Sequence, residues 1–108
     1  KSVVEKFVKN VKKDISIDYI QKIVSDYFSL DVETLCSKTR KRHIVQARQL
    51  AMFFSKKYTK SSLANIGSLT GDRDHATVLH ACKTVDNLLE TDKQFKGYFE
   101  DINKKLAM

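Results

Sequence analysis

Polar side chains with several hydrogen-bonding groups cluster directly after Gly71. The cluster consists of Arg73, Asp74, His75, Thr77 and His80. Guanidinium, carboxylate, imidazole and hydroxyl groups together can hydrogen-bond to a polar partner. They do not suit catalysis or metal binding, because no nucleophile and no third metal ligand stands at a suitable spacing. We therefore expect a binding site here, and neither an enzyme nor a metal centre.

The same stretch begins a predicted helix over residues 74–89. Asp72 or Asp74 can cap it, because a carboxylate accepts hydrogen bonds from the free N–H groups of a first helical turn. Apolar residues recur behind the cap at helical spacing, at Val78, Ala81, Cys82, Val85, Leu88 and Leu89. The helix is therefore expected to be buried along one side and polar at its N-terminal tip. Such a tip can enter a groove of another molecule.

A shorter predicted helix precedes this one. Ser61 or Ser62 begins it, and Gly71 ends it, as a glycine commonly does after a helix. Its apolar face consists of Leu63, Ile66 and Leu69. Residues 61–89 thus have the spacing of a helix-turn-helix, whose second helix enters the major groove of DNA. Many helical hairpins share this spacing, so the pattern alone indicates DNA binding only weakly.

Positive charge is concentrated in about one third of the chain. The net charge is +7, yet no acidic residue lies between Glu33 and Asp72. The basic residues of that interval are Lys38, Arg40, Lys41, Arg42, Arg48, Lys56, Lys57 and Lys60. The rest of the chain carries twelve basic and thirteen acidic residues, a net charge of −1. A surface of one sign repels itself and usually has a polyanionic partner. A lysine-rich face that only aids solubility is the weaker alternative.

The composition predicts a single all-α domain. The 108 residues, 42% of them hydrophobic, suffice for one core and are too few for two. The chain has no proline and three glycines, too few turn formers for a β architecture. No apolar run reaches the length of a membrane span. Cys36 and Cys82 are expected to be buried free thiols, so we expect a soluble domain in the reducing cytoplasm.

Further helices are predicted from apolar periodicity and capping residues. They cover residues 17–29, 32–36, 44–58 and a last segment that ends near residue 106. Ser16 and Asp31 are the predicted N-caps of the first two. Thr91 and Gln94 form the pattern of a capping box, which predicts the start of the last helix.

The N-terminal segment is predicted to be a short amphipathic helix over residues 3–11. We interpret residues 1–13 as a connector to an upstream domain, because the chain begins at Lys1 without an initiator methionine. A weak contact of this segment with acidic phospholipids is the alternative. The connector is preferred, since so short a segment binds lipid weakly by itself.

Two stretches of the chain resemble a known family. Ile66-Gly67, followed by Gly71-Asp72-Arg73-Asp74-His75-Ala76-Thr77-Val78-Leu79-His80-Ala81, closely resembles the signature of the C-terminal DNA-binding domain of DnaA, the bacterial chromosomal replication initiator. Residues 37–52 resemble that family's basic loop and following helix. The resemblance covers about residues 15–106, and the signature is its most specific part.

The resemblance implies a fold, a function and a cellular place. Residues 14–108 would form a helix-turn-helix domain, a helical bundle of the Trp-repressor-like class. It would bind double-stranded DNA at short A/T-rich boxes of the replication origin, and so initiate and regulate chromosomal replication. No phosphate-binding glycine motif is present, so no cofactor is expected in this fragment and ATP would bind in the missing upstream domain. We expect a cytoplasmic, nucleoid-associated protein whose isolated domain is a monomer.

The resemblance also implies the DNA-binding residues: Arg40, Arg42, Arg48, Gln49, Lys56, Thr59, Arg73, Asp74, His75, Ala76 and Thr77. Arg40, in the basic loop, would enter the minor groove, because a guanidinium is attracted to the narrow, strongly negative groove of A/T tracts. Arg42 is the alternative for that role. Arg48 and Gln49 would lie near the DNA backbone and the major groove. Without the resemblance, these two residues would be assigned to an exposed helical face.

The signature residues would contact bases and phosphates. Asp74 can accept a hydrogen bond from N4 of cytosine, and the methyl group of Ala76 can pack on the methyl group of thymine. His75 can donate to a base or a phosphate, and Thr77 with the first-turn N–H groups suits a phosphate. Further phosphate contacts are expected from Lys56 and Thr59.

Two residues depart from the family pattern. The family usually has glycine at the position of Asp72 and threonine at the position of Ala76. The negative charge of Asp72 is expected to weaken DNA binding slightly. Ala76 keeps a methyl group for thymine but lacks the hydroxyl that could hydrogen-bond. His80, one turn further along, is expected either to be partly buried or to contact a phosphate.

Two other classes of protein share some of these features. A helix-turn-helix transcription regulator with an unrelated operator would have the same charge pattern, but the signature residues argue against it. A lipid-binding helical module would carry its basic groups on the helix over residues 3–11, whereas they are concentrated within residues 38–60. We therefore prefer origin binding and keep the regulator as the alternative.

Overall fold

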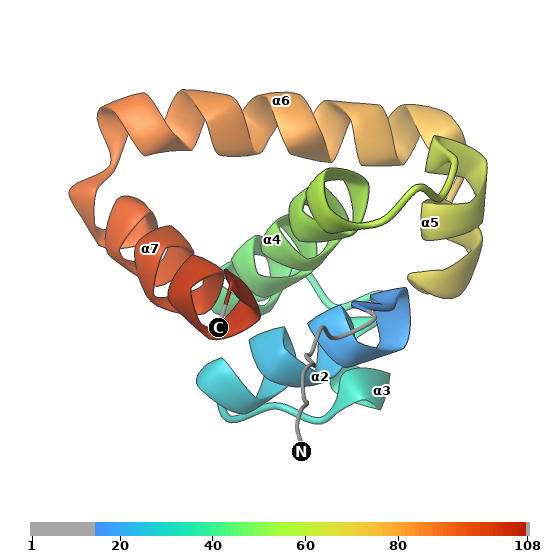
Figure 1. Ribbon diagram of the computed structural model, residues 1–108, viewed down its shortest axis with the longest axis horizontal. Helices are drawn as coiled ribbons and strands as arrows, with labels where there is room; N and C mark the ends of the chain where they lie inside the picture. Colours follow the sequence, from blue (N-terminus) through green and yellow to red (C-terminus); the bar gives the residue numbers. More distant parts are fainter. Residues whose placement is uncertain (1–14, 108) are drawn as a thin grey trace, which may run out of the picture.

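The computed structural model describes residues 15–107, and helices account for most of them (Figure 1). In chain order the helices are α2 (Ile17–Tyr27), α3 (Val32–Leu35), α4 (Arg42–Tyr58), α5 (Leu63–Leu69), α6 (His75–Thr91) and α7 (Lys93–Ala107). No strand occurs in this part of the chain, which confirms the all-α prediction. None of these helices is long and apolar enough to cross a membrane. The predicted connector helix and its phospholipid contact lie outside the described residues.

Side-chain caps determine where several helices begin. Ser16, Asp31, Ser62 and Asp74 each accept a hydrogen bond from the backbone N–H three residues further on, at 3.1, 2.7, 3.0 and 2.9 Å. Each satisfies an N–H group that has no partner within its helix. Of the alternatives left open by the sequence, the caps are therefore Ser62 and Asp74. The helix predicted from residue 44 begins two residues earlier, at Arg42.

The capping box predicted at Thr91 and Gln94 is wrong. Thr91 is the last residue of α6, and its hydroxyl donates to the carbonyl of Asn87 at 2.9 Å. Asp92 caps α7 instead, because its Oδ1 accepts from the N–H groups of Gln94 at 3.1 Å and Phe95 at 3.2 Å. A threonine hydroxyl is readily satisfied by the carbonyl one turn earlier, whereas an aspartate next to it is the stronger N-cap.

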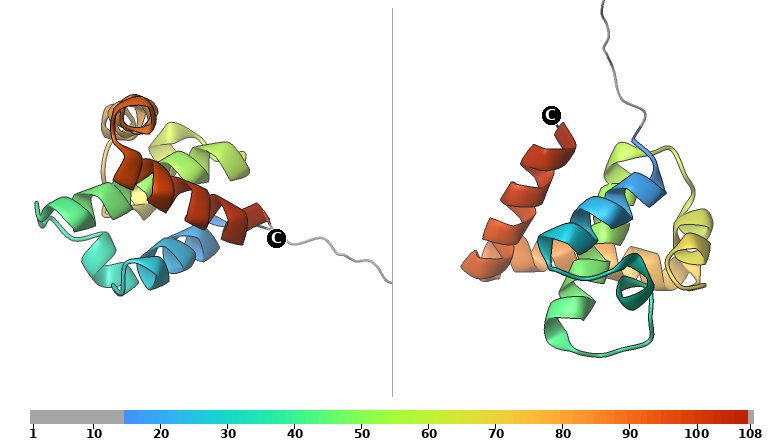
Figure 2. Two further views of the ribbon diagram at one scale, coloured as in Figure 1. Left: turned by 90° about the vertical axis from the view of Figure 1, so that its left-hand side faces the viewer. Right: turned by 90° about the horizontal axis from the view of Figure 1, so that it is seen from below.

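Helix α4 is the central element of the fold. It packs against α2 and α3 on one side and against α5 and α6 on another. In Figure 1, α6 runs along the top of the molecule and α2 lies at the bottom, with α4 between them. Figure 2 shows, in its right-hand view, α7 and α5 on opposite sides of α2. The long helix α6 therefore borders the molecule, and only one of its sides is covered.

Two clusters of buried apolar side chains hold these helices together. The larger one comprises Ile20, Val24, Leu35, Ala47, Leu50, Ala51, Phe54, Val85, Phe95, Ile102 and Leu106. The smaller one comprises Ile17, Met52, Ile66, Val78 and Ala81, and it joins α5 and the first half of α6 to α2 and α4. Burial of such side chains stabilises a fold by about 1.5–3 kcal/mol each. The smaller cluster therefore fixes the helix-turn-helix on the rest of the domain.

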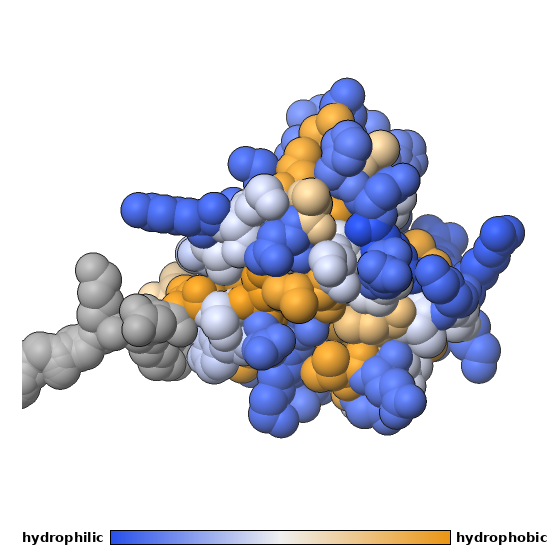
Figure 3. All heavy atoms as spheres, turned by 90° about the vertical axis from the view of Figure 1, so that its right-hand side faces the viewer, coloured by the Kyte–Doolittle hydropathy of each residue, from blue (hydrophilic) through white to orange (hydrophobic). Residues whose placement is uncertain are grey.

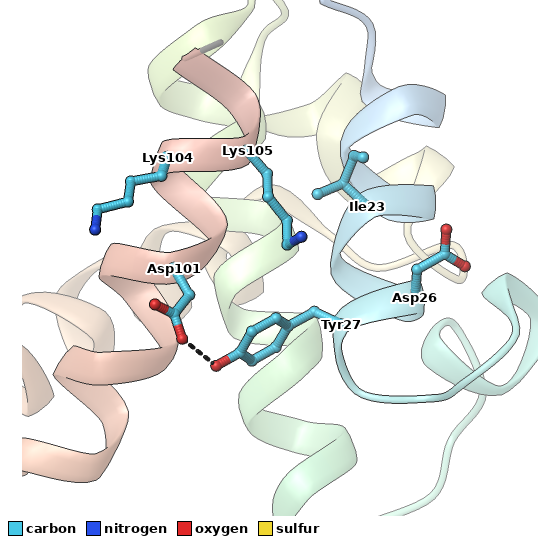
Figure 4. Close-up of a pocket in the computed structure, with 6 residues that line it drawn as sticks. All are labelled: Ile23, Asp26, Tyr27, Asp101, Lys104 and Lys105. Carbon is cyan, nitrogen blue, oxygen red and sulfur yellow. Dashed lines mark hydrogen bonds between the residues drawn. The ribbon is translucent and has the colours of Figure 1, made fainter.

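Helix α7 is bound to α2 through aromatic and polar contacts. The hydroxyl of Tyr27 donates to Asp101 at 2.7 Å, and Figure 4 shows this bond at the edge of a groove of about 560 Å³ between the two helices. Burial and the hydrogen bond to Asp101 raise the pKa of Tyr27 to about 12. The Tyr58 hydroxyl likewise donates to Asn103. These bonds attach the C-terminal helix to the opposite side of α4 from α5.

The two thiols are less enclosed than predicted. Cys36 and Cys82 are free, and each is partly buried and not fully buried. Cys36 follows the short helix α3, where the chain turns toward the basic loop. Burial is the main cause that raises the pKa of both thiols, so both favour the protonated form at neutral pH.

Candidate nucleic-acid interface

The predicted helix-turn-helix consists of α5, a tight turn and α6. Gly67 in α5 lies against the backbone that begins α6. A Cβ atom added to it would stand 2.1 Å from the carbonyl oxygen of Arg73, and the N–H of Arg73 donates to the carbonyl of Gly67 at 2.7 Å. Only a residue without a side chain permits this approach. The glycine therefore determines how closely the two helices pack.

The turn contains two consecutive residues in the left-handed region of backbone conformation. Gly71 has φ +73° and Asp72 has φ +59°. Glycine adopts this region without strain, whereas other L-residues do so at a cost. A glycine at the position of Asp72, as the resemblance in the sequence analysis leads us to expect, would therefore relieve strain in this turn. The departure at Asp72 affects the backbone as well as the charge.

The N-terminal tip of α6 is exposed and polar. His75 and Ala76 are exposed, and Asp74 accepts from both the N–H of Thr77 at 2.9 Å and its hydroxyl at 2.8 Å. These two bonds hold the pKa of the Asp74 carboxyl below its usual value, with the backbone bond as the larger cause. Both bonds end on Oδ1 of an exposed side chain, which leaves Oδ2 as a second acceptor. Of the two alternatives for His80, partial burial is wrong, because its side chain is exposed.

Arg48 is not on an exposed helical face, so the interpretation from periodicity alone is wrong. Only 7% of Arg48 is exposed. Its Nε donates to the carbonyl of Leu35 at 2.8 Å, and its Nη2 donates to the carbonyls of Ser37 at 2.7 Å and Thr39 at 3.2 Å. Burial lowers the pKa of its guanidinium, and the charge of Arg73 lowers it further. The neighbouring Gln49 is partly buried.

Arg73 contacts the same loop from the other side. Its Nη1 donates to the carbonyls of Thr70 at 2.6 Å and Cys36 at 3.1 Å, and its Nη2 donates to the carbonyl of Ser37 at 2.8 Å. The Ser37 carbonyl therefore accepts from two arginines. Gly71 also lies on this loop, since a Cβ there would stand 2.2 Å from the Cys36 carbonyl oxygen. The helix-turn-helix and the basic loop thus form one unit.

Most of the predicted basic residues stay at the surface. Lys38, Arg40, Lys41, Arg42 and His43 are exposed in the loop and in the first turn of α4. Arg42 forms an ion pair with Asp92 at 3.8 Å, across to the junction of α6 and α7. Exposed pairs of this kind contribute little to stability. This pairing makes Arg40 the better candidate for a contact from the loop.

The phosphate-binding candidates at the other end of α4 differ from each other. Lys56 is exposed, close enough to α6 for its charge to act on the Cys82 thiol. The hydroxyl of Thr59 instead donates to the Ser55 carbonyl at 2.6 Å and accepts from the N–H of Ser61 at 3.2 Å. Thr59 thus terminates α4, while Lys56 remains available to a partner.

Four of the predicted residues meet around one small hollow between α4 and α6. The hollow has a volume of about 120 Å³ and is lined by Val45, Arg48, Gln49, Met52, Arg73, Thr77, His80 and Ala81.

Figure 3 views the side of the molecule that carries α5 and the tip of α6, where hydrophilic side chains separate smaller apolar patches. Among the exposed apolar residues, Leu69 and Leu79 are 48% and 44% accessible. At the tip of α6 itself, the exposed residues Asp74, His75 and Thr77 are polar.

Sequence reasoning missed the backbone groups of this site. The carbonyls of Leu35, Cys36 and Ser37 bind the two arginines, yet their side chains give no signal of it.

Comparison with known proteins identifies relatives of this chain. The family described as "Bacterial dnaA protein helix-turn-helix" matches residues 17–85. The whole chain is 79% identical to part of the chromosomal replication initiator protein DnaA of Flavobacterium psychrophilum, and it covers 23% of that protein. Over 96% of the chain, it is 46% identical to the same-named protein of Bacteroides thetaiotaomicron, of which it covers 22%. The chain thus spans less than a quarter of the length of these relatives.

The close approach at Gly67 predicts opposite effects for two helical glycines. Gly67→Ala should destabilise the domain by about 2 kcal/mol or more, because the new methyl group meets a backbone carbonyl that cannot move alone. Gly97→Ala should stabilise it by about 0.5–1 kcal/mol, because a Cβ at position 97 in α7 meets nothing within 4 Å. Urea unfolding of both variants measures this difference. Equal stabilisation of both variants would contradict the geometry described for the turn.

Proposed function

The chain belongs to the bacterial DnaA helix-turn-helix family, and on that basis we propose that it binds double-stranded DNA sequence-specifically at the A/T-rich boxes (DnaA boxes) of a replication origin. The observation that carries the proposal is the attachment of an exposed basic loop to the exposed tip of α6 through Arg73. The relatives are named chromosomal replication initiators. Within such an initiator, this chain would attach the protein to the origin.

The tip of α6 supplies the proposed contacts in the major groove. A helix N-terminus that projects from its domain can enter this groove and present its first residues to base edges. His75 is exposed there and can donate to a base or a phosphate. Oδ2 of Asp74 can accept from N4 of cytosine, and the exposed methyl group of Ala76 can pack on thymine. These three residues therefore carry the proposed sequence preference.

The basic loop supplies the proposed contact in the neighbouring minor groove. Arg40 is exposed and lies one residue after Thr39, whose carbonyl accepts from Arg48 at 3.2 Å. A guanidinium favours the narrow minor groove of A/T tracts, where the potential is most negative. Contacts from one protein to both grooves would account for a preference for A/T-rich boxes.

Attraction to the DNA backbone is assigned to other residues. Lys56, Lys57 and Lys60 are exposed at the C-terminal end of α4 and just after it. Phosphate contacts of this kind increase affinity for all sequences and release counterions. They set the orientation of the domain on DNA and carry no sequence information. We therefore assign the general attraction to DNA to these lysines, and the sequence preference to the tip of α6 and to Arg40.

A transcription regulator of the same helix-turn-helix type is the alternative function. It would use the same physical contacts on a different operator. The relatives that match nearly the whole chain carry the name of a replication initiator, which favours origin boxes as the target.

The test is a gel shift of this domain on a duplex with an origin box and on a scrambled duplex of the same composition, each at two salt concentrations. The box should bind tighter by a factor on the order of 10³. His75→Ala should cost about 1–3 kcal/mol on the box and little on the scrambled duplex. Lys56→Ala should weaken both duplexes alike and reduce the salt slope by roughly one counterion.

A matched control is Lys22→Ala, which removes one exposed lysine from α2, on the far side of α4 from α6. It should leave both affinities unchanged. Equal affinity of the unmodified domain for the two duplexes would overturn the proposal. Equal losses on both duplexes for His75→Ala would remove the assignment of base contacts to α6.

The conformation of Asp72 predicts a gain from glycine. Asp72→Gly should stabilise the fold by about 0.5–1 kcal/mol, because glycine adopts φ +59° without strain. It should also tighten binding to both duplexes, since a negative charge near the DNA is removed. Ser29→Gly is the matched control, because Ser29 also has φ +59° but lies between α2 and α3. That variant should gain stability without a change in affinity, and a loss of stability in both would refute this explanation.

A further inference from the structure

The carbonyl of Ser37 is the meeting point of two positively charged side chains. It accepts from Nη2 of Arg48 at 2.7 Å and from Nη2 of Arg73 at 2.8 Å. Arg48 belongs to α4, and Arg73 belongs to the turn before α6. Two like charges that converge on one acceptor repel each other, and the repulsion grows as water is excluded. The arrangement therefore requires a compensating set of contacts.

Backbone carbonyls provide that compensation. Arg48 also donates to the carbonyls of Leu35 and Thr39, and Arg73 also donates to those of Cys36 and Thr70. Of the salt bridges found among residues 15–107, neither involves these two arginines. In the described residues, the two guanidinium groups are thus stabilised by the partial charges of carbonyls, most of which belong to residues 35–39.

The hydrogen bonds of Arg48 and Arg73 link the two parts of the domain that are proposed to contact DNA. Arg48 joins residues 35–39 to the middle of α4, and Arg73 joins Cys36 and Ser37 of this segment to the turn before α6. Arg40 follows directly after this segment, and Asp74 follows directly after Arg73. The distance between the two proposed DNA-contacting groups therefore depends on these hydrogen bonds.

We propose that Arg48 and Arg73 are positioning residues: they fix the basic loop to the helix-turn-helix so that Arg40 and the tip of α6 reach neighbouring grooves in one register. This inference rests on the proposed function. It assigns the two arginines a different role from a phosphate contact, in which the positive charge alone would matter. It also assigns them more than general stabilisation, since their loss should act through Arg40.

Lysine separates charge from geometry at these positions. Arg48→Lys keeps the positive charge, but a single ammonium group cannot reproduce the donations of the planar guanidinium, from Nε and Nη2, to three separate carbonyls. If Arg48 acts by charge, lysine should replace it. If Arg48 acts by position, lysine should fail and the contribution of Arg40 should disappear with it.

The experiment is a double-mutant cycle of Arg48→Lys and Arg40→Ala, with dissociation constants measured on the origin box and the scrambled duplex. Each single variant should weaken binding to the box about tenfold. The double variant should bind the box no more weakly than Arg48→Lys alone, because a misplaced Arg40 contributes nothing. On the scrambled duplex, Arg48→Lys should change affinity less than about twofold, since the charge is kept.

The matched control is a second cycle of Arg48→Lys with Lys56→Ala. Lys56 contacts none of the loop carbonyls, so the two losses should multiply. If Arg48 only stabilised the fold, Arg48→Lys would show the same coupling with Arg40→Ala as with Lys56→Ala. Should Arg48→Lys fail to fold, as judged by circular dichroism, Arg73→Lys gives the same test because Arg73 is less buried and donates to the same Ser37 carbonyl.

Two results would overturn the proposal. One is a lysine variant that binds the box as tightly as the unmodified domain. The other is a pair of losses that multiply in the cycle with Arg40→Ala. The ratio of box to scrambled affinity in the unmodified domain tests the proposed function separately. A domain that prefers the box but shows no coupling would keep its function and lose this assignment.

Discussion

A single carbonyl group, that of Ser37, links the two halves of the proposed interface. It accepts hydrogen bonds from Arg48 in α4 and from Arg73 in the turn before α6. Around it, Gly71 allows the turn to lie on the Cys36 carbonyl, and Gly67 allows α5 to lie on the Arg73 carbonyl. Hydrogen bonds and close backbone contacts therefore join the loop, the turn and the start of α6. If α6 and the loop bind two grooves, such a joined unit needs little ordering of the protein on binding.

The core beneath this unit explains why it can carry unfavourable features. Ile66 of α5 and Val78 of α6 are buried together with Met52 of α4, and this packing joins the helix-turn-helix to α4. Their burial offsets a left-handed aspartate, two arginines without carboxylate partners and the exposed N-terminal tip of α6. Strain and like charges of this kind commonly persist at functional sites because the surroundings hold them in place. Stability and recognition are thus assigned to different layers of the same small domain.

The sequence predicted most features that depend on local or periodic patterns, although the capping box at Thr91 and Gln94 was wrong. Ser16, Asp31 and Ser62 cap their helices as expected, because capping involves residues only three positions apart. The sequence did not predict features that depend on backbone groups far away in the chain. Arg48 fits an exposed helical face by periodicity, yet it is buried because carbonyls 35–39 surround it. The φ of Asp72 could be anticipated only through the family glycine, since nothing in the local composition requires two left-handed residues.

The most direct test of two-groove binding is an analogue scan of every A·T pair in an origin box. Inosine·cytosine has the minor-groove groups of A·T but the major-groove groups of G·C, and diaminopurine·thymine has the reverse. We expect two separate blocks of sensitive base pairs, about 5 base pairs or half a helical turn apart. Inosine should weaken binding only in the block that α6 contacts through the major groove. Diaminopurine should weaken binding only in the block that the basic loop contacts through the minor groove. Losses caused by one analogue alone, or spread without blocks, would contradict binding through α6 and the basic loop together.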